Sequence, residues 1–246
     1  MTGTTGKVAI VTGASRGIGA AIAARLAQDG FTTVVNFAGR HADAEALVDR
    51  IERAGGRAVA AQADVGDPAA VGRLFDAAET AFGGVDVLVN NAGVMALKPI
   101  AESDDALFDR QVAINLRGSF NGMREAARRL RAGGRIINLS SSVIGLRLET
   151  YGVYAATKAA VEAMTAVLSK ELRGRSITVN AVAPGPTATA LFLDGKPPEL
   201  VARMAAMSPL ERLGTPEDIA AAVAFLAGPD GAWINGQVLR ANGGLV

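Results

Sequence analysis

Short apolar runs rich in valine and isoleucine alternate along this chain with longer alanine-rich segments, and this alternation constrains its fold more than any other feature. Most of the runs are apolar nearly throughout, as expected for strands buried on both faces of a parallel sheet. The expected strands are residues 8–12, 33–37, 58–64, 85–90, 135–140, 177–183 and 237–241. Seven strands alternating with six helical segments predict an α/β fold, a doubly wound (Rossmann) seven-stranded parallel sheet with helices on both faces.

The same pattern indicates one domain. Ile18, Ile22 and Leu26 recur every four residues, as on one face of a helix. No linker rich in proline or serine interrupts the alternation, so residues 1–246 are expected to form a single domain. The one long irregular stretch, about residues 184–215, contains five of the nine prolines and is expected to be a lid over a binding site.

Composition excludes several classes of function. Half of the 246 residues are hydrophobic and 20% are charged, so the chain can bury a sizeable core. A net charge of +1 argues against a nucleic-acid or anionic-membrane partner, although the four arginines between residues 124 and 131 leave weak docking of an acidic carrier open. The chain has no cysteine, which excludes disulfides, zinc–thiolate sites and thiol nucleophiles, and no metal site is expected.

Neither a membrane span nor a targeting segment is expected. No run of about 18 apolar residues occurs, the length that a membrane-spanning helix needs. The first residues carry one positive charge and lead directly into the first expected strand, unlike a signal or transit peptide. A cytoplasmic location is therefore expected.

A glycine-rich turn, Thr12–Gly19, follows the first expected strand and opens the first helix. Gly13 lets the chain turn sharply off the strand, while Gly17 and Gly19 remove side chains where a pyrophosphate would approach the backbone. The free N–H groups at the start of the helix would face that anion. The turn therefore predicts a dinucleotide site, with cofactor contacts from Gly13, Ser15, Arg16, Gly17, Ile18 and Gly19.

The end of the second expected strand favours NADP(H) over NAD(H). An acidic residue there would accept hydrogen bonds from the adenosine ribose and repel a 2′-phosphate. This chain has Asn36 and no carboxylate before Asp43, whereas Arg16 and Arg40 are placed to reach a 2′-phosphate. These residues are expected to contact the cofactor. His41, the only histidine, is expected at the surface near the adenosine, where it cannot serve in a Ser-His-Asp triad.

Tyr154 and Lys158 lie four residues apart, so a phenol and an ammonium group share one face of an expected helix. A free tyrosine titrates at about 10, and lowering its pKa to about 7 requires roughly 4 kcal/mol of preference for the phenolate. A neighbouring lysine and a positively charged nicotinamide can supply that preference in a sheltered site. Ser141 and Ser142, about a dozen residues earlier, offer a hydroxyl beside the phenol. Asn115 is either a core amide bonded to backbone or a partner in a relay.

With these features the chain resembles the short-chain dehydrogenase/reductase family over essentially its whole length. Six motifs occur in the family's order, and together they are far more specific than any one of them. They are T-G-x3-G-x-G at Thr12–Gly19, Asp64 after the third expected strand, N-N-A-G at Asn90–Gly93, Asn115, a serine before Y-x3-K, and P-G-x3-T at Pro184–Thr189.

The resemblance implies roles for these residues. Tyr154 would be the general acid/base, and Lys158 would lower its pKa and hold the nicotinamide ribose. The serine would stabilise the substrate oxygen, and Asn115 would support a water relay to Lys158. Asp64 and Val65 would flank the adenine. The further cofactor contacts expected are Asn91, Ala92, Gly93, Pro184, Gly185, Thr187 and Thr189.

The chain departs from the family's pattern in two places. The serine thirteen residues before the tyrosine is Ser141, whereas the serine three residues before a glycine is Ser142, ahead of Gly145. We favour Ser142 as the catalytic serine, because the length of the loop after it can vary. Near the C-terminus, Asn242 replaces the acidic residue that the family commonly has before Gly-Gly, so a local ion pair cannot be assumed there.

The sequence thus predicts an NADP(H)-dependent oxidoreductase that transfers a hydride between nicotinamide and a carbonyl or secondary alcohol, with a 3-oxoacyl thioester as one candidate substrate. One alternative is an enoyl-thioester reductase, since Tyr151 has the seven-residue spacing to Lys158 that those enzymes show. The other is a non-catalytic NADP-sensing protein. A mostly apolar substrate is expected, because the predicted pocket includes Met95, Leu97, Leu146, Leu148, Leu191, Phe192 and Met207.

The resemblance also implies self-association, because members of the family are mostly tetramers. Helices expected at about residues 103–131 and 152–173 have alanine-rich faces that can pack across a two-fold axis. Residues 236–238 and the glycines after them match the closing strand, which usually packs between subunits. A homotetramer is therefore expected.

Overall fold

The computed structural model describes residues 6–246, so the expectation about a targeting segment falls partly on residues outside the described range. Seven strands form one sheet in which every neighbouring pair is parallel. They are β1 (Val8–Val11), β2 (Thr32–Phe37), β3 (Arg57–Gln62), β4 (Val85–Asn90), β5 (Leu130–Leu139), β6 (Thr178–Pro184) and β7 (Val238–Ala241). Their spatial order is β3-β2-β1-β4-β5-β6-β7. The predicted doubly wound, seven-stranded parallel sheet is confirmed.

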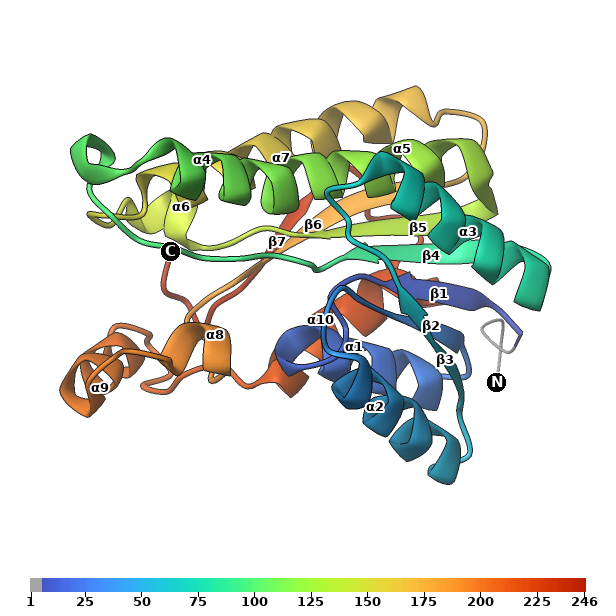
Figure 1. Ribbon diagram of the computed structural model, residues 1–246, viewed down its shortest axis with the longest axis horizontal. Helices are drawn as coiled ribbons and strands as arrows, with labels where there is room; N and C mark the ends of the chain where they lie inside the picture. Colours follow the sequence, from blue (N-terminus) through green and yellow to red (C-terminus); the bar gives the residue numbers. More distant parts are fainter. Residues whose placement is uncertain (1–5) are drawn as a thin grey trace.

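Helices cover both faces of this sheet (Figure 1). One face carries α1 (Gly17–Gln28), α2 (His41–Arg53) and α10 (Pro216–Ala227), and the other carries α3 (Pro68–Phe82), α5 (Gly118–Arg129) and α7 (Gly152–Glu171). In β1, Ala9 and Val11 pack into the first core, while Val8 and Ile10 pack into the second. Successive side chains of a strand point to opposite faces, so a strand between two helical layers must be apolar throughout.

The outer strands depart from the expectation of burial on both faces. Arg57 and Val59 in β3 are exposed, and so are Val238 and Leu239 in β7. Each of these strands has a neighbour on one side only within the chain. The start of β5 also differs from the prediction of residue 135, because Leu130 already pairs with β4 ahead of a shift in register.

The helix expected over about residues 103–131 is interrupted by a wider turn. α4 (Asp105–Gln111) passes into the π-helical segment η2 (Val112–Arg117) and then into α5, with helical backbone angles at both junctions. η2 contains Asn115, which is 0% exposed. Turns of this kind are rare and often occur at functional sites.

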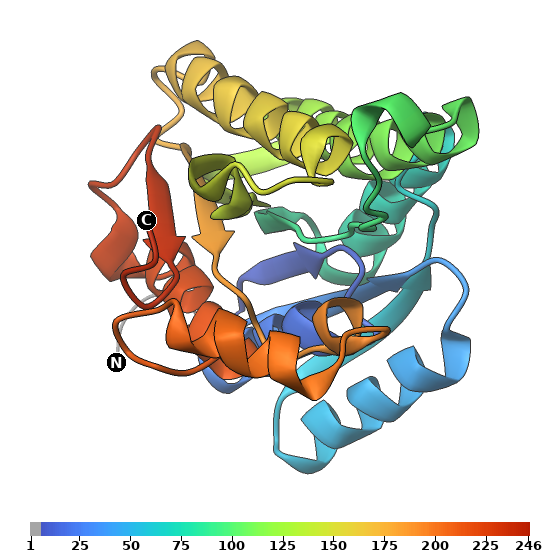
Figure 2. The same cartoon turned by 90° about the vertical axis from the view of Figure 1, so that its left-hand side faces the viewer.

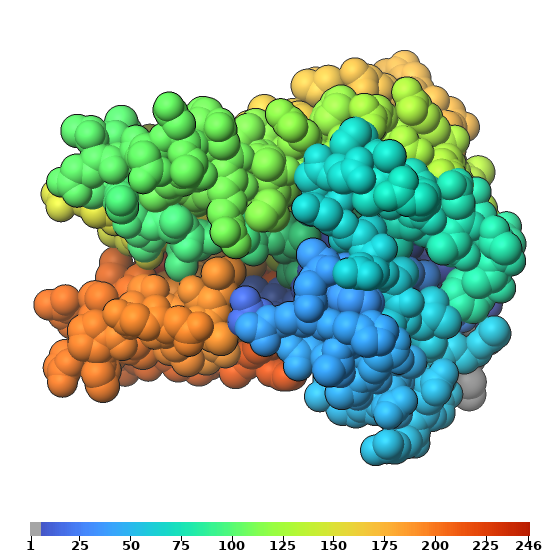
Figure 3. Space-filling view, in the orientation of Figure 1, coloured from blue at the N-terminus to red at the C-terminus, as the bar shows by residue number. Residues whose placement is uncertain are grey.

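The segment expected to form a lid carries two short helices, α8 (Ala190–Leu193) and α9 (Pro198–Ala206). They lie beyond the carboxyl ends of the strands (Figure 2), and the surface is hollowed between them and α4 (Figure 3). Three further short turns are η1 (Ile100–Glu102), α6 (Val143–Leu146) and η3 (Pro229–Gly231). None of the helices within residues 6–246 combines the length and the hydropathy that crossing a membrane requires.

Candidate active site

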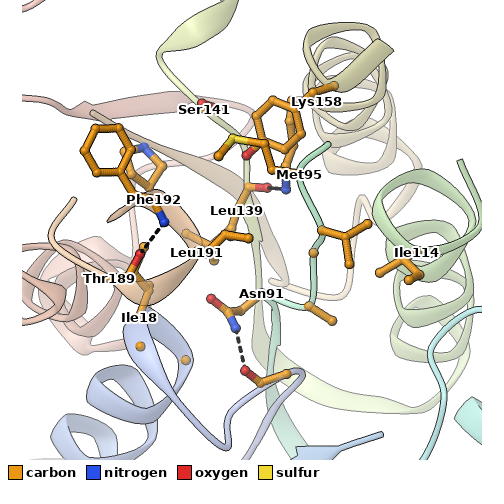
Figure 4. Close-up of a pocket in the computed structure, with 18 of the residues that line it drawn as sticks. Ile18, Asn91, Met95, Ile114, Leu139, Ser141, Lys158, Thr189, Leu191 and Phe192 are labelled. Carbon is orange, nitrogen blue, oxygen red and sulfur yellow. Dashed lines mark hydrogen bonds between the residues drawn. The ribbon is translucent and has the colours of Figure 1, made fainter. Parts of the chain in front are cut away.

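A cavity of about 1090 Å³ opens at the carboxyl ends of the strands. It lies where β1 and β4 are neighbours and the chain leaves them toward opposite faces, the position at which doubly wound sheets bind ligands. Its walls come from several elements (Figure 4), and it exceeds the range of about 300–1,000 Å³ that holds drug-sized ligands. All the residues expected to contact the cofactor line it: Gly13, Ser15, Arg16, Gly17, Ile18, Gly19, Asn36, Arg40, Asp64, Val65, Asn91, Ala92, Gly93, Tyr154, Lys158, Pro184, Gly185, Thr187 and Thr189.

Close backbone contacts shape the glycine turn between β1 and α1. Gly13 has a φ of 61°, and a Cβ there would lie 2.8 Å from the Cα of Ala92, so no larger residue fits. α1 begins at Gly17 with no side chain capping it, so the N–H groups of its first turn are available to an anion. The turn therefore fits the diphosphate of a dinucleotide.

Two asparagines hold this turn in place. The Asn91 amide donates to the carbonyl oxygens of Thr12 and Gly13 at 2.9 and 3.0 Å (Figure 4). Asn36 is 1% exposed, and its Oδ1 accepts from the Gly13 N–H at 3.2 Å. The Asn36 Nδ2 donates to two backbone carbonyls at 3.2 and 3.1 Å. Both residues line the cavity as predicted, but their amides support the turn instead of offering free groups to a cofactor.

The two arginines expected at a 2′-phosphate border the cavity beside the end of β2. Arg16 is exposed. Arg40 forms an exposed ion pair with Asp43 at 3.1 Å, and because such pairs contribute only about 0–1 kcal/mol, a phosphate can compete for Arg40. The predicted surface position of His41 is confirmed, since its side chain is 73% exposed.

Tyr154 and Lys158 lie one turn apart on α7 and line the same cavity. The Lys158 Nζ donates to the Leu139 carbonyl at 2.8 Å and lies 5.8 Å from the centre of the Tyr154 ring (Figure 4). Burial lowers the pKa of Lys158 to about 8. Burial also raises the pKa of Tyr154 to about 12, although a hydrogen bond with Ser141 opposes this shift.

Without the cofactor, the protein's own groups raise the pKa of Tyr154, and the prediction that Lys158 and a positively charged nicotinamide together lower it stays a prediction. Withdrawing the phenolate from water costs more than the Ser141 hydrogen bond returns, and the neighbouring Tyr151 raises the pKa further. The same withdrawal from water lowers the pKa of the Lys158 ammonium on which the prediction relied. At neutral pH, Tyr154 holds its proton and is ready to act as an acid.

Both Ser141 and Ser142 line the cavity, and their hydrogen bonds favour Ser141 over the preferred Ser142 as the serine beside the phenol. Ser142 is 2% exposed, and its hydroxyl donates to the Ala183 carbonyl and accepts from the Asn242 amide, both at 3.0 Å. The Ser141 Oγ accepts from a backbone N–H at 3.3 Å, and its side chain is the one hydrogen-bonded to Tyr154. These contacts agree with the thirteen-residue spacing to Tyr154, which points to Ser141, and which serine is catalytic stays a prediction.

Asn115 lies in the core and does not line the cavity. Its amide bonds to the N–H and carbonyl of Val94 at 2.8 and 2.9 Å and to the Thr157 hydroxyl at 3.3 Å, which is the core-amide alternative. A Cβ on Gly93 would lie 3.4 Å from the Asn115 Oδ1 and 3.6 Å from the Lys158 Nζ. Gly93 thus keeps the space between these two groups open, and the relay role of Asn115 stays a prediction.

Comparisons with known proteins agree over almost the whole chain. A family model described as enoyl-(acyl carrier protein) reductase matches residues 13–246. An Arabidopsis thaliana protein named NADPH-dependent aldehyde reductase-like protein, chloroplastic, is 48% identical over 255 residues, covering 98% of this chain and 94% of its own. A versicolorin reductase of Emericella nidulans is 43% identical over 251 residues, covering 97% and 95%. The structure of a short-chain dehydrogenase from Burkholderia cenocepacia in complex with NADP superposes with a TM-score of 0.92 at 40% identity, covering 98% of both chains.

This chain belongs to the short-chain dehydrogenase/reductase family.

In this member of the short-chain dehydrogenase/reductase family, the substrate end of the cavity is mostly apolar. Tyr151 lines it as predicted. Leu97 and Met207 do not line the cavity, which corrects the prediction for both, and Met207 is 47% exposed. The remaining predicted wall residues do line it: Met95, Leu146, Leu148, Leu191 and Phe192.

The residues of the cavity wall that the sequence does not single out include Arg110, Ile114 and Met204. Arg110 and Ile114 are four residues apart, so helical periodicity would have placed them on one face once Ile114 was known to face the cavity. Nothing in the sequence distinguishes Met204 from its apolar neighbours in α9. Within residues 6–246, no group of three or more acidic or histidine side chains is placed to hold a metal ion.

The basic stretch at residues 124–131 is neutralised by acidic neighbours. Arg129 forms ion pairs of 2.6 Å with Asp76 and Glu79. Arg131 pairs with an aspartate at 3.0 Å, and the other two arginines both pair with Glu125. Because its charges are matched, this surface gives no support to the docking of an acidic carrier.

Proposed function

We propose that the protein is an NADP(H)-dependent oxidoreductase that transfers a hydride between nicotinamide and a carbonyl or secondary alcohol carbon. One observation carries the proposal: a single cavity joins the glycine turn, with Arg16 and Arg40, to Tyr154 with its hydroxyl partner Ser141. Relatives are named as NADPH-dependent, and structural neighbours contain NADP. The cofactor is accordingly NADP(H), with NAD(H) as the less favoured alternative.

The residues along the cavity fit this cofactor from end to end. The first turn of α1 would hold the diphosphate, Arg16 and Arg40 the 2′-phosphate, and Asp64 with Val65 the adenine. Lys158 would hold the nicotinamide ribose, and residues 184–189 the carboxamide. When bound, the reduced cofactor supplies the hydride.

The protein's contribution is to place and protonate the substrate oxygen. In the direction of reduction, Tyr154 donates its proton to the carbonyl oxygen while the carbonyl carbon accepts the hydride, which yields the alcohol. The Ser141 hydroxyl donates a hydrogen bond to the same oxygen and stabilises its developing charge. Burial raises the pKa of Tyr154 and keeps the phenol protonated, which suits its role as the proton donor in reduction.

An apolar ketone or aldehyde is the substrate class that the cavity wall favours. A 3-oxoacyl thioester remains a candidate. Loss of NADPH absorbance with a panel of apolar aldehydes, cyclic ketones and a 3-oxoacyl thioester tests this directly. An enoyl thioester belongs in the same panel, because the matching family model is described as an enoyl reductase. Turnover of that compound alone would favour C=C reduction, and tight NADPH binding without any turnover would favour the NADP-sensing alternative.

Removing Arg16 tests the cofactor preference. Arg16→Ala is expected to weaken NADPH binding about tenfold or more, since a hydrogen bond to a charged group contributes roughly 1.5–3 kcal/mol, and to leave NADH binding unchanged. Arg53→Ala, on an 83% exposed side chain outside the cavity, is the matched control. Binding is read from the cofactor's own fluorescence, because the sole tryptophan, Trp233, is 98% exposed and does not line the cavity. Equal losses for NADPH and NADH would contradict the proposed phosphate contact.

Exchanging the two serines separately tests their roles. Ser141→Ala is expected to lower kcat for carbonyl reduction by about 10²-fold, as the removal of one donor to a developing oxyanion does. Ser142→Ala is expected to act on stability instead, by about 1 kcal/mol, because it breaks the link between Ala183 and Asn242. Steady-state kinetics and thermal unfolding of both variants measure the two effects. A larger loss of kcat in Ser142→Ala than in Ser141→Ala would identify Ser142 as the catalytic serine.

We also propose that the chain assembles as a homotetramer. Phe120 on α5 and Val167 on α7 are 45% and 57% exposed, and Val238 and Leu239 on the edge strand β7 are 36% and 37% exposed. These are two separate apolar surfaces, and burying both requires two different contacts with further copies. A monomeric mass by light scattering would contradict the proposal.

A further inference from the structure

The stretch of chain that follows β4 forms part of the substrate wall without any regular secondary structure. Residues 91–99 contain no helix or strand, yet Val94 and Met95 line the cavity. Backbone N–H and C=O groups that leave water need partners, and such a segment has none from a sheet or helix of its own. Side chains from α4 and η2 supply them.

Two amide side chains bind this segment as a neighbouring strand would. Asn115 accepts from the Val94 N–H at 2.8 Å and donates to the Val94 carbonyl at 2.9 Å. Gln111 accepts from the Ala96 N–H at 3.4 Å and donates to the Ala96 carbonyl at 3.2 Å. Each amide therefore satisfies both polar groups of one residue, and alternate residues of the segment are bound.

The spacing explains why a helix can do this. Gln111 ends α4 and Asn115 lies about one turn later in the π-helical η2. One turn of an α-helix rises about 5.4 Å, and alternate residues of an extended chain are about 6.6 Å apart, so the two spacings are comparable. Gln111 and Asn115 are four apart, and they bind Val94 and Ala96, which are two apart. We call these two side chains the amide pair.

Met95 lies between the two bound residues, and its side chain lines the cavity (Figure 4). Its position in the wall is therefore set by the bonds on either side of it. The Asn115 amide also donates to the Thr157 hydroxyl on α7, and the Lys98 N–H donates to the Thr150 carbonyl at 3.2 Å. The wall is thus held in a fixed place relative to the helix that carries Tyr154.

Gln111 itself cannot touch a substrate. It is 1% exposed and does not line the cavity, so its amide acts only through the backbone that it binds. Its two bonds, at 3.2 and 3.4 Å, are longer than the Asn115 bonds at 2.8 and 2.9 Å, so the Ala96 side of Met95 is the less tightly held.

We propose that Gln111 is a positioning residue that sets substrate selectivity by fixing Met95 against the bound carbonyl compound. This inference rests on the proposed function for the identity of the ligand. Loss of the Gln111 bonds frees one side of Met95, so bulky apolar carbonyl compounds, which fill the wall, lose contact, whereas small aldehydes do not.

The test measures binding of one bulky cyclic ketone and one small aldehyde to the complex of the protein with NADP⁺, by calorimetry. Gln111→Met keeps the length of the side chain and removes both hydrogen bonds. It is expected to raise the dissociation constant of the bulky ketone about tenfold, the equivalent of one hydrogen bond, and to leave those of the small aldehyde and of NADPH unchanged. Equal losses for both carbonyl compounds would overturn the proposal.

A double-mutant comparison isolates Met95. If Gln111 acts through Met95, Gln111→Met has no further effect on bulky-ketone binding when Met95→Ala is already present. Additive losses would show that Gln111 acts by another route and would overturn the proposal. A wild-type protein that binds NADPH but neither carbonyl compound would overturn the proposed function itself, and this inference with it.

Gln111→Glu provides a second variant in case Gln111→Met does not fold. A protonated carboxyl has a donor and an acceptor like the amide, whereas an ionised one places a second oxygen against the Ala96 carbonyl. Bulky-ketone binding relative to wild type is therefore expected to be near normal at low pH and to weaken as pH rises. If the ratio of the bulky-ketone dissociation constants of Gln111→Glu and wild type does not change with pH, the proposed hydrogen bonds are contradicted. Gln28→Met, on an exposed residue at the end of α1, is the control for both variants.

Discussion

Tyr154→Phe is expected to lower kcat for carbonyl reduction by about 10²–10⁴-fold, the range that a positioned general acid contributes, while NADPH still binds. The variant keeps the ring that lies 5.8 Å from the Lys158 Nζ and removes only the hydroxyl that is hydrogen-bonded to Ser141. The substrate oxygen then keeps the hydrogen bond from Ser141 but has no general acid to protonate it. Stopped-flow turnover and cofactor fluorescence measure the two quantities on the same preparation.

Tyr151→Phe is the matched control, because Tyr151 lines the same cavity and its ring meets that of Tyr154 edge-on, with centroids 6.4 Å apart. It is expected to retain most of the wild-type kcat. A larger loss in Tyr151→Phe than in Tyr154→Phe would contradict the proposed acid and favour the tyrosine spacing of enoyl-thioester reductases.

The parts of this fold that the sequence predicts well are those where one physical requirement acts on every residue. Ala9 and Val11 face one helical layer while Val8 and Ile10 face the other, so β1 has to be apolar at each position. The edge strand β7 has no such requirement, and its exposed Val238 and Leu239 look the same in the sequence as buried residues. The sequence therefore predicts the number and positions of the strands better than the burial of the outer ones.

The sequence predicts the site residues well where close backbone contacts require a particular residue type. It predicts them less well where a side chain has several possible hydrogen-bond partners. Gly13 is required because a Cβ would lie 2.8 Å from Ala92. By contrast, Ser141 and Ser142 are adjacent hydroxyls, and only the fold shows that Ser142 is bonded to Ala183 and Asn242. Both serines line the cavity, and which of the two hydroxyls is already bonded within the protein depends on the exact end of a strand, which periodicity does not resolve.

Gln111 shows a second reason why the sequence does not predict every residue that shapes the site. Asn115 belongs to a recognisable motif, but Gln111 becomes significant only because the end of α4 lies beside Ala96. The sequence likewise suggests that Lys158 and a bound nicotinamide lower the Tyr154 pKa, but it does not show how strongly burial acts in the opposite direction. Burial depends on the whole fold, and it moves the pKa values of Tyr154 and Lys158 in opposite directions.

Lys158→Met is expected to lower kcat by about 10²-fold or more and yet to raise stability at neutral pH. Lys158 is 4% exposed, and burial lowers its pKa from 10.5 to about 8. Holding the ammonium form in the core at pH 7 therefore lowers the free energy of unfolding by about 3 kcal/mol, which the substitution restores. The substitution also removes the hydrogen bond to Leu139, which costs about 1 kcal/mol, so the expected net stabilisation is about 2 kcal/mol.

The difference in the free energy of unfolding between Lys158→Met and wild type depends on pH, and this dependence shows whether the buried ammonium causes it. Between the folded pKa of about 8 and the unfolded value of 10.5, the folded wild type binds fewer protons than the unfolded chain, so its stability rises with pH across that window. The destabilisation is complete below pH 8 and is gone above 10.5, whereas methionine has no such dependence. Urea denaturation at pH 7 and at pH 10 should therefore show the Lys158→Met variant more stable by about 2 kcal/mol at the lower pH and by much less at the higher one. A difference that is the same at both pH values would mean that folding leaves the Lys158 pKa unshifted, and that burial of its ammonium group does not destabilise the fold.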